Sequence, residues 1–334
     1  MRIISMNTLR GIHHVTAITS SAEKNYAFFT NILGMRLVKK TVNQDDIQTY
    51  HLFFADDRGS AGTDITFFDF PGIPKAVRGT NEIFKTGLRV PSDEALVYWV
   101  KRFDKYNVTH SGIYEQFGRK VIDFQDFDEQ LYQLVSDEAD TGVAPGIPWQ
   151  KGPVPNEYGI RGLGPIFVRI ADFNFYRQVL ETVLGFRHAD SVGETHLFEV
   201  GEGGNGGRMI VEHNATLGQA QQGFGSVHHM AFRVKDRKEL EEWIAHMGSY
   251  RFPISGYVDR FYFESLYANI AQGILLEFAT DGPGFIDDEE PYETLGERLA
   301  LPPKFRNNRE EIEGLVRQFD TVRSTKTFEK EYLD

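Results

Sequence analysis

The chain repeats one order of secondary structure four times. Each unit starts with a strand, continues into a helix and ends in several strands, judged from alternating apolar residues for strands and 3.6-residue spacing for helices. The first strands of units two, three and four end in nearly the same letters, GLRV, FVRI and AFRV. Because self-similarity at a fixed period indicates a duplicated fold, we predict an α+β protein built from four βαβββ modules.

The four modules group by sequence into two domains. Residues 139–159 contain four prolines and four glycines, a composition typical of a linker. We therefore predict an N-terminal domain over 1–138 with modules one and two, and a C-terminal domain over 160–284 with modules three and four. Each is expected to pair its modules into cup-shaped mixed β-sheets with helices on the outside. A tail over 285–334 contains one amphipathic helix, predicted over 308–322, which we expect to pack against the body or a neighbouring subunit of a homo-oligomer.

The composition excludes several classes of function. The 36 basic and 48 acidic residues give a net charge of −12, which disfavours binding to nucleic acid. No apolar run approaches the roughly 20 residues that span a bilayer, and the N-terminus lacks the apolar core of a signal peptide, so we expect a cytoplasmic protein. Since the chain has no cysteine, any metal must be held by His, Asp or Glu. Such ligands favour Fe(II), Mn(II) or Zn(II).

Four of the ten histidines form two doublets, in the segments IHHVTA and VHHMAF. Aligning the first strands of the modules on FRV and VRI places His14 and His229 at equivalent positions. The same position holds Pro165 in module three and Lys85 in module two. Only modules one and four therefore carry the histidine, and the two doublets read as two halves of one site.

The last strands of the modules offer the carboxylate. They end in Glu277, Glu212, Gln133 and, less clearly aligned, Asp69. If modules one and four face each other, two imidazoles and the Glu277 carboxylate converge in one cup. Two histidines and one carboxylate on one face of a metal, with open positions for substrate and oxygen, are typical of non-haem Fe(II) oxygenases. Because side chains alternate along a strand, we expect one histidine of each doublet to bind the metal and the other to lie beside it.

These residues resemble a known family. The βαβββ units, with a His on the first strand and a Glu on the last, are similar to those of the vicinal oxygen chelate superfamily. Within it, the chain resembles the ring-cleaving dioxygenases that open hydroquinones over nearly its whole length. The segments that carry this resemblance are LRGIHHVTAIT, VKKTVN, TYHLFFAD, VHHMAF and DRFYFESLY. The resemblance implies an Fe(II) enzyme that acts on a small aromatic substrate with O2. It also implies a ligand set and four residues that act on the substrate: metal ligands His14, His229 and Glu277, and catalytic neighbours His13, His228, Arg260 and Tyr267.

That resemblance suggests roles for the neighbours. A neutral imidazole, that of His13 or His228, would accept the proton of a metal-bound phenol. Arg260 or Tyr267 would stabilise the developing oxyanion. Whether the ring is a hydroquinone or a catechol stays open at this point, as do the metal used in the cell and the oligomeric state.

Two other functions compete with the dioxygenase. A glyoxalase-type isomerase or lyase would need four protein ligands, and Asp69 is the candidate for the fourth. Against it, the DFPG context of Asp69 is that of a turn, where Asp satisfies backbone groups. A non-catalytic protein that sequesters an aromatic drug would need the cup but no metal, and the intact His/His/Glu set disfavours it.

Overall fold

A computed structural model describes residues 8–287 and 289–333. Residues 1–7 of the predicted N-terminal domain and residues 288 and 334 of the tail lie outside the described residues. The strands are β1 (Ile12–Ile18), β2 (Arg36–Asn43), β3 (Asp46–Ala55), β4 (Asp64–Phe68), β5 (Glu82–Val90), β6 (Tyr114–Gln116), β7 (Arg119–Gln125), β8 (Leu131–Ser136), β9 (Leu163–Ile170), β10 (Arg187–Val192), β11 (Thr195–Glu199), β12 (Arg208–His213), β13 (Ser226–Val234), β14 (Ile254–Asp259), β15 (Phe263–Ala271) and β16 (Ile274–Pro283). The α-helices are α1 (Ala22–Ala27), α2 (Asp93–Tyr106), α3 (Phe173–Gln178), α4 (Arg237–Ser249) and α5 (Arg309–Leu315).

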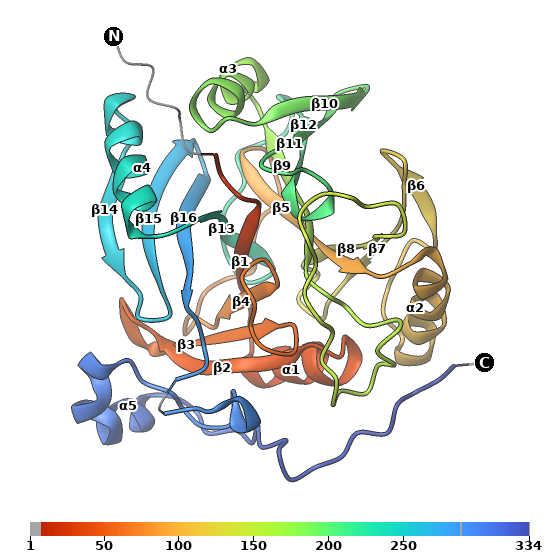
Figure 1. Cartoon of the computed structure of the whole chain (residues 1–334), viewed down its shortest axis with the longest axis vertical. Coiled ribbons are helices and arrows are strands. Elements are labelled where there is room, and N and C mark those ends of the chain that lie inside the picture. Colours follow the sequence, from red (N-terminus) through yellow and green to blue (C-terminus); the bar gives the residue numbers. More distant parts are fainter. Residues whose placement is uncertain (1–7, 288, 334) are drawn as a thin grey trace.

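The strands form two eight-stranded mixed sheets, ordered β14-β15-β16-β13-β1-β4-β3-β2 and β10-β11-β12-β9-β5-β8-β7-β6. Within a module the first and last strands run parallel, as β1 and β4 do, and two modules join through antiparallel first strands, as β1 and β13 do. Both sheets curl, with the helices on the outside (Figure 1). The predicted α+β fold of four βαβββ modules in cup-shaped sheets is confirmed.

Each sheet combines one module from the N-terminal half of the chain with one from the C-terminal half. Modules one and four share the first sheet, and modules two and three share the second. The sheets thus do not follow the sequence division into 1–138 and 160–284, and that division stays a prediction. The arrangement has a consequence for function, because it makes the strands that carry the two histidine doublets direct neighbours.

The duplicated modules repeat even local irregularities. Helix α1 is capped by the Ser21 side chain, continues into one turn of π-helix over Phe28–Ile32 and stops at Gly34, whose φ is +64°. Helix α3 continues in the same way into a π-turn over Val179–Val183. The apolar faces of the longer helices pack on the sheets, as Trp243 of α4 does against a phenylalanine of β16. None of the helices in the described part of the chain is long and apolar enough to cross a membrane.

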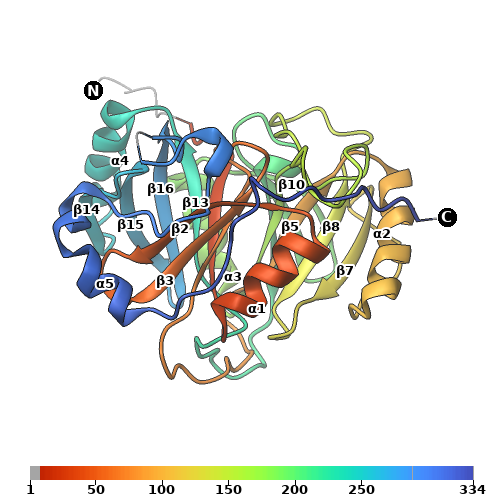
Figure 2. The same ribbon diagram turned by 90° about the horizontal axis from the view of Figure 1, so that it is seen from below.

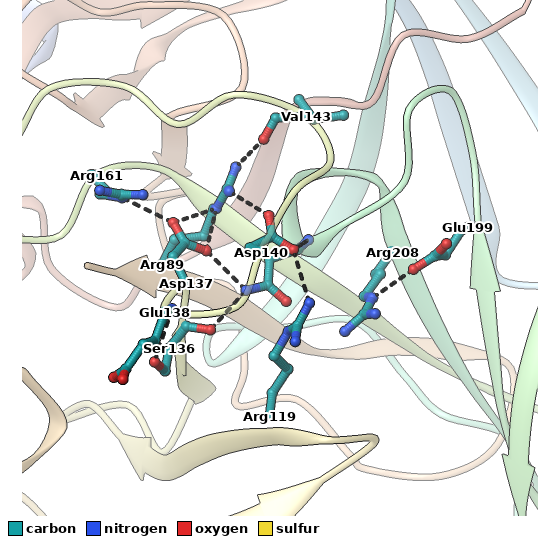
Figure 3. A network of polar contacts seen from close by, with 11 residues as sticks. Arg89, Arg119, Ser136, Asp137, Glu138, Asp140, Val143, Arg161, Glu199 and Arg208 are labelled. Atoms are coloured by element: carbon teal, nitrogen blue, oxygen red, sulfur yellow. Dashed lines mark hydrogen bonds and ion pairs between the residues drawn. The ribbon is translucent and has the colours of Figure 1, made fainter. Parts of the chain in front are cut away.

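The proline-rich segment 139–159 is fixed to the body by a buried ionic network (Figure 3). The Arg89 guanidinium donates to the Asp137 carboxylate at 2.8 Å, to Asp140 at 2.8 Å and to the carbonyl of Val143 at 2.8 Å. Arg89 and Asp137 are buried, and the side chain of Asp140 is only 3% exposed. Because a buried charge is tolerated only when it is paired and hydrogen-bonded, this network holds the start of the segment in one place.

The tail departs from its predicted helix. Helix α5 ends at Leu315, and the chain then continues extended, with ψ of 145° at Val316. The amphipathic pattern of 308–322 is overridden by contacts with the body: Phe319 packs on the rings of Tyr26 and Tyr50. The extended tail crosses beneath the molecule to α2, where the Glu331 carboxylate accepts a hydrogen bond from a tyrosine (Figure 2).

Candidate metal centre

The two histidine doublets lie at two β-bulges of the β1–β13 ladder. The register of this antiparallel pair skips His13 on β1 and His228 on β13, so each is the extra residue of a bulge. A bulge re-aims a side chain and commonly occurs beside an active site. The second histidine of each doublet therefore lies beside the first: Nδ1 of His13 is 2.9 Å from Nδ1 of His14, and Nδ1 of His228 is 2.8 Å from Nδ1 of His229.

Three buried side chains from β1, β13 and β16 converge beside the bulges. Oε2 of Glu277 lies 3.0 Å from Nε2 of His14 and 3.0 Å from Nε2 of His229. The two Nε2 atoms are 3.3 Å apart. The other Glu277 oxygen, Oε1, accepts a hydrogen bond from the Ser265 hydroxyl at 2.5 Å. The three predicted ligand residues are thus one group, with their ligand atoms within 4.8 Å of one another.

A chain of hydrogen bonds fixes the proton on Nδ1 of the triad imidazole His14. The Thr280 carbonyl lies 3.0 Å from Nε2 of His13, and a carbonyl can only accept, so this nitrogen carries the proton. Nδ1 of His13 is then the acceptor for the Nδ1 proton of His14, which leaves a bare lone pair on Nε2 of His14. On the other strand Nδ1 of His228 and Nδ1 of His229 make the same contact, and a metal on Nε2 of His229 would leave the proton of that contact on His229. Such contacts beyond the ligands orient and tune metal-binding histidines.

The resulting group fits a metal cation. Two imidazole nitrogens and a carboxylate oxygen face one another at 3.0 to 3.3 Å, an arrangement that is repulsive without a positive charge between them. Ligands about 2.1 Å from one ion and at right angles to one another lie about 3.0 Å apart, close to the observed separations. Histidine and carboxylate donors without sulfur suit Fe(II), Mn(II) or Zn(II).

The protonation states agree with this fit. Burial opposes ionisation of Glu277, but the charges and hydrogen bonds of the two triad imidazoles in their protonated form outweigh it and hold the pKa of Glu277 well below its usual value. A metal cation in the same place would favour the carboxylate in the same way. Burial, with help from the adjacent imidazole, lowers the pKa of His13 to about 3 and that of His228 to about 3. Both neighbours of the triad are therefore neutral at physiological pH, as the tautomers above require.

The register corrects part of the sequence alignment. Glu277 lies opposite the position two residues after His229, and the matching position of module one, two residues after His14, faces Thr66. Asp69 lies three residues further along, where its carboxylate accepts a hydrogen bond from a backbone N–H at 2.8 Å. Within the described chain Asp69 is not part of the metal-binding group. The last strand of module one therefore offers a hydroxyl where module four offers a carboxylate.

The second sheet holds an ammonium group at the equivalent position. Its register matches Gln133 to Glu277, as predicted, but places Ile210 where Glu212 was expected. The Lys85 ammonium, which replaces the triad histidine, lies 3.0 Å from Oδ1 of Asp123. The Lys85 ammonium and the Asp123 carboxylate thus take the place of a metal site in this cup.

A pocket of about 310 Å³ opens onto the triad. Of the predicted neighbours, His228, Arg260 and Tyr267 line it, whereas His13 does not and lies buried behind His14. Nε of Arg260 donates to the Tyr267 hydroxyl at 3.0 Å. Burial raises the pKa of Tyr267, so its hydroxyl stays protonated. The full lining is His14, Thr41, Asn43, Gln44, Asp45, His51, Phe53, Phe68, His228, His229, Arg260, Tyr262, Phe263, Tyr267 and Leu275.

One lining residue, His51, was missed in the sequence because it has no counterpart in another module. It stacks between Phe53 and Phe68, with ring centroids 4.0 and 4.4 Å away. Its Nε2 lies 2.9 Å from the Thr66 hydroxyl, which in turn contacts the Thr16 hydroxyl at 2.8 Å. The signal that could have revealed it is strand alternation, since His51 and Phe53 lie on the same face of β3.

Comparison with known proteins places the chain among relatives with the same overall length. Residues 11–132 match the family model of the Glyoxalase/Bleomycin resistance protein/Dioxygenase superfamily. The "Putative ring-cleaving dioxygenase MhqA" of Bacillus subtilis (strain 168) is 42% identical over 92% of this chain and 98% of its own length. The "Chlorohydroquinone/hydroquinone 1,2-dioxygenase" of Sphingobium indicum is 27% identical over 91% of this chain and 95% of its own.

A solved structure agrees with this placement. The crystal structure of a "putative dioxygenase" from Bacillus subtilis subsp. subtilis str. 168 superposes with a TM-score of 0.86 at 32% identity, covering 95% of this chain and 99% of the other. By sequence, fold and the buried His/His/Glu group, the chain belongs to the glyoxalase/bleomycin resistance protein/dioxygenase superfamily.

Proposed function

We propose that this protein is an Fe(II)-dependent dioxygenase that opens a hydroquinone-type aromatic ring with O2. The observation that carries the proposal is a metal-binding group of three protein ligands, with Thr66 where a fourth carboxylate would stand, facing a pocket large enough for one ring. Three ligands leave positions for both a phenolic oxygen and O2. The ring-cleaving relatives support the reaction class, and the hydroquinone dioxygenase among them supports the substrate.

His14, His229 and Glu277 would hold the iron. Fe(II) bound there supplies a Lewis acid for the phenol and a path for electrons from the ring to O2. The same donors accept Mn(II) or Zn(II), of which only the redox-active manganese could replace iron in this chemistry.

The tautomers divide the roles of the two neighbouring histidines. Both ring nitrogens of His13 are used, one by the Thr280 carbonyl and one by His14, so His13 positions the ligand and does not touch the substrate. His228 uses Nδ1 for His229 and lines the pocket, so its Nε2–H is available to a bound phenolate or oxyanion. His228 therefore acts as a hydrogen-bond donor, and the role of proton acceptor falls to another group.

Tyr267 and Arg260 form a second donor pair in the pocket. The Tyr267 oxygen accepts from Arg260, and the hydroxyl also forms a hydrogen bond with the Ser265 side chain. The Tyr267 O–H would turn from Ser265 to donate to the substrate. Arg260 is held 5.1 Å above the Tyr267 ring, which aligns the cation with the hydroxyl that it polarises. A donor pair prepared in advance stabilises the negative charge that develops as the ring is attacked.

The two competing functions are less well supported. A four-ligand isomerase lacks its fourth carboxylate, because Thr66 occupies that position and Asp69 is bonded to backbone. A metal-free drug-binding protein would have no use for three lone pairs brought together in the core.

Oxygen uptake tests the proposal. Protein loaded anaerobically with Fe(II) and then exposed to air is given hydroquinone, methylhydroquinone or catechol at an oxygen electrode. We expect one O2 consumed per hydroquinone opened, with slower or no uptake on catechol. Iron-loaded protein that consumes no oxygen with any of the three rings would refute the dioxygenase.

A further inference from the structure

The mouth of the pocket holds an ion pair that the reaction itself does not require. Oδ2 of Asp45, on the turn between β2 and β3, lies 3.0 Å from Nη2 of Arg260. The Asp45 side chain is 72% exposed and that of Arg260 is 19% exposed. The preceding residue of the turn, Gln44, donates its side-chain amide to the Arg260 carbonyl at 2.7 Å. The turn is thus attached to Arg260 through both its side chain and its backbone.

Asp45 occupies the part of the guanidinium that would otherwise be open to a ligand. Arg260 uses Nε for the Tyr267 hydroxyl and Nη2 for Asp45. A carboxylate on an incoming ring would seek the same forked donor, because arginine pairs best with planar anions. It would first have to displace Asp45.

The charges around the pocket lead to the same conclusion. Among the residues that line it, Asp45 and Arg260 carry full charges of opposite sign, and the Glu277 carboxylate lies 3.0 Å from both triad histidines. Two carboxylates and one guanidinium leave one net negative charge. A divalent ion reverses this to one net positive charge, which a single phenolate neutralises. A ring with an additional carboxylate would leave the site negative in a partly desolvated pocket, which is unfavourable.

We propose that Asp45 makes the site selective for hydroquinones whose substituents are uncharged, and that it rejects rings carrying an ionised carboxyl group by occupying Arg260 and by repulsion. The inference rests on the proposed function and adds to it a residue that determines specificity. The selectivity is measured as the ratio of kcat/KM for two substrates, so it can be separated from the overall rate of the enzyme.

The test compares an uncharged with a carboxylated hydroquinone. Wild type, Asp45→Asn and Asp46→Asn, each loaded with Fe(II), are assayed with methylhydroquinone and with 2,5-dihydroxybenzoate, and anaerobic binding of both rings is measured by calorimetry. Asp46 is the matched control because it directly follows the turn as the first residue of β3, does not line the pocket and accepts from the Thr49 hydroxyl. Asp45 is exposed, so its substitution leaves the core intact.

We expect Asp45→Asn to raise kcat/KM for 2,5-dihydroxybenzoate relative to methylhydroquinone about tenfold, with a matching gain in anaerobic binding, as removal of one nearby charge implies. Asp46→Asn should leave that ratio within about twofold, because its charge is more remote and screened by salt. An unchanged ratio in Asp45→Asn, or an equal rise in Asp46→Asn, would overturn the inference. Iron-loaded wild-type protein that consumes no oxygen with hydroquinone, methylhydroquinone or catechol would instead refute the proposed function.

Discussion

Replacing His13 with alanine should weaken metal binding although His13 is not a ligand. The substitution removes the acceptor of the His14 Nδ1 proton and the donor to the Thr280 carbonyl, both of them buried. Each buried group left without a partner costs about 1–3 kcal/mol, and the lost ring also vacates a contact with Phe263. We therefore expect the metal-free protein to lose about 3–5 kcal/mol of stability, and the metal affinity to fall about 10- to 100-fold because His14 is no longer held in the correct tautomer.

The assay is competition for Fe(II) or Zn(II) against a chelator of known affinity, on protein shown by circular dichroism to be folded at the assay temperature. His13→Gln is the matched variant, since its amide can accept from His14 with oxygen and donate to the Thr280 carbonyl with nitrogen. We expect His13→Gln to recover most of the affinity that His13→Ala loses. His14→Ala, which removes a ligand, should lose the metal altogether.

Two results would refute this reasoning. If folded His13→Ala binds metal as tightly as wild type, the contact between the two imidazoles does not position the ligand. If His13→Gln is as weak as His13→Ala, the ring itself matters, and the hydrogen-bond relay from Thr280 is not the cause.

Three further predictions concern stability and are read from urea or thermal unfolding. The buried Lys39 ammonium lies 2.7 Å from the Glu290 carboxylate, its closest partner. Glu290→Ala removes that partner and should lower the free energy of unfolding by roughly 3–5 kcal/mol, and the double variant Lys39→Met/Glu290→Leu should recover most of the loss. A Glu290→Ala protein as stable as wild type would contradict this. Burial lowers the pKa of His13 and His228 to about 3, so below about pH 6.5 the native state binds fewer protons than the unfolded state. The free energy of unfolding of the metal-free protein should therefore fall by roughly 2 kcal/mol per histidine between pH 6.5 and 5. A stability that does not change with pH over this range would exclude burial of the two histidines in neutral form. Glu331→Ala removes the carboxylate that anchors the tail to α2 and should lower the Tm by a few degrees, so an unchanged Tm would mean that the tail adds no stability.

The repeat made the fold and the metal-binding group predictable from sequence. Periodicity and capping are local signals, so the four modules, the Ser21 cap and the stop at Gly34 follow from short stretches of chain. Equivalence between modules then selected His14 and His229 from ten histidines, and the structure brings both to Glu277.

What escaped prediction depends on contacts between distant segments. The bulges at His13 and His228 arise from the register of two strands more than two hundred residues apart, which neither strand specifies alone. Counting from the end of a strand pointed to Asp69, whereas the ladder places Thr66 opposite β1. The amphipathic pattern around Phe319 is real, but its ring packs on Tyr26 and Tyr50 and not on a helix of its own.

The origin of the oxygen atoms in the product tests the central claim most directly. Iron-loaded protein is incubated with methylhydroquinone under 18O2, and the product is identified by mass spectrometry. We predict a ring-opened acid in which both atoms of one O2 molecule are retained, apart from exchange with water at the carbonyl group. A ring-opened product without label, or an intact quinone formed while oxygen is reduced, would contradict a dioxygenase built on His14, His229 and Glu277.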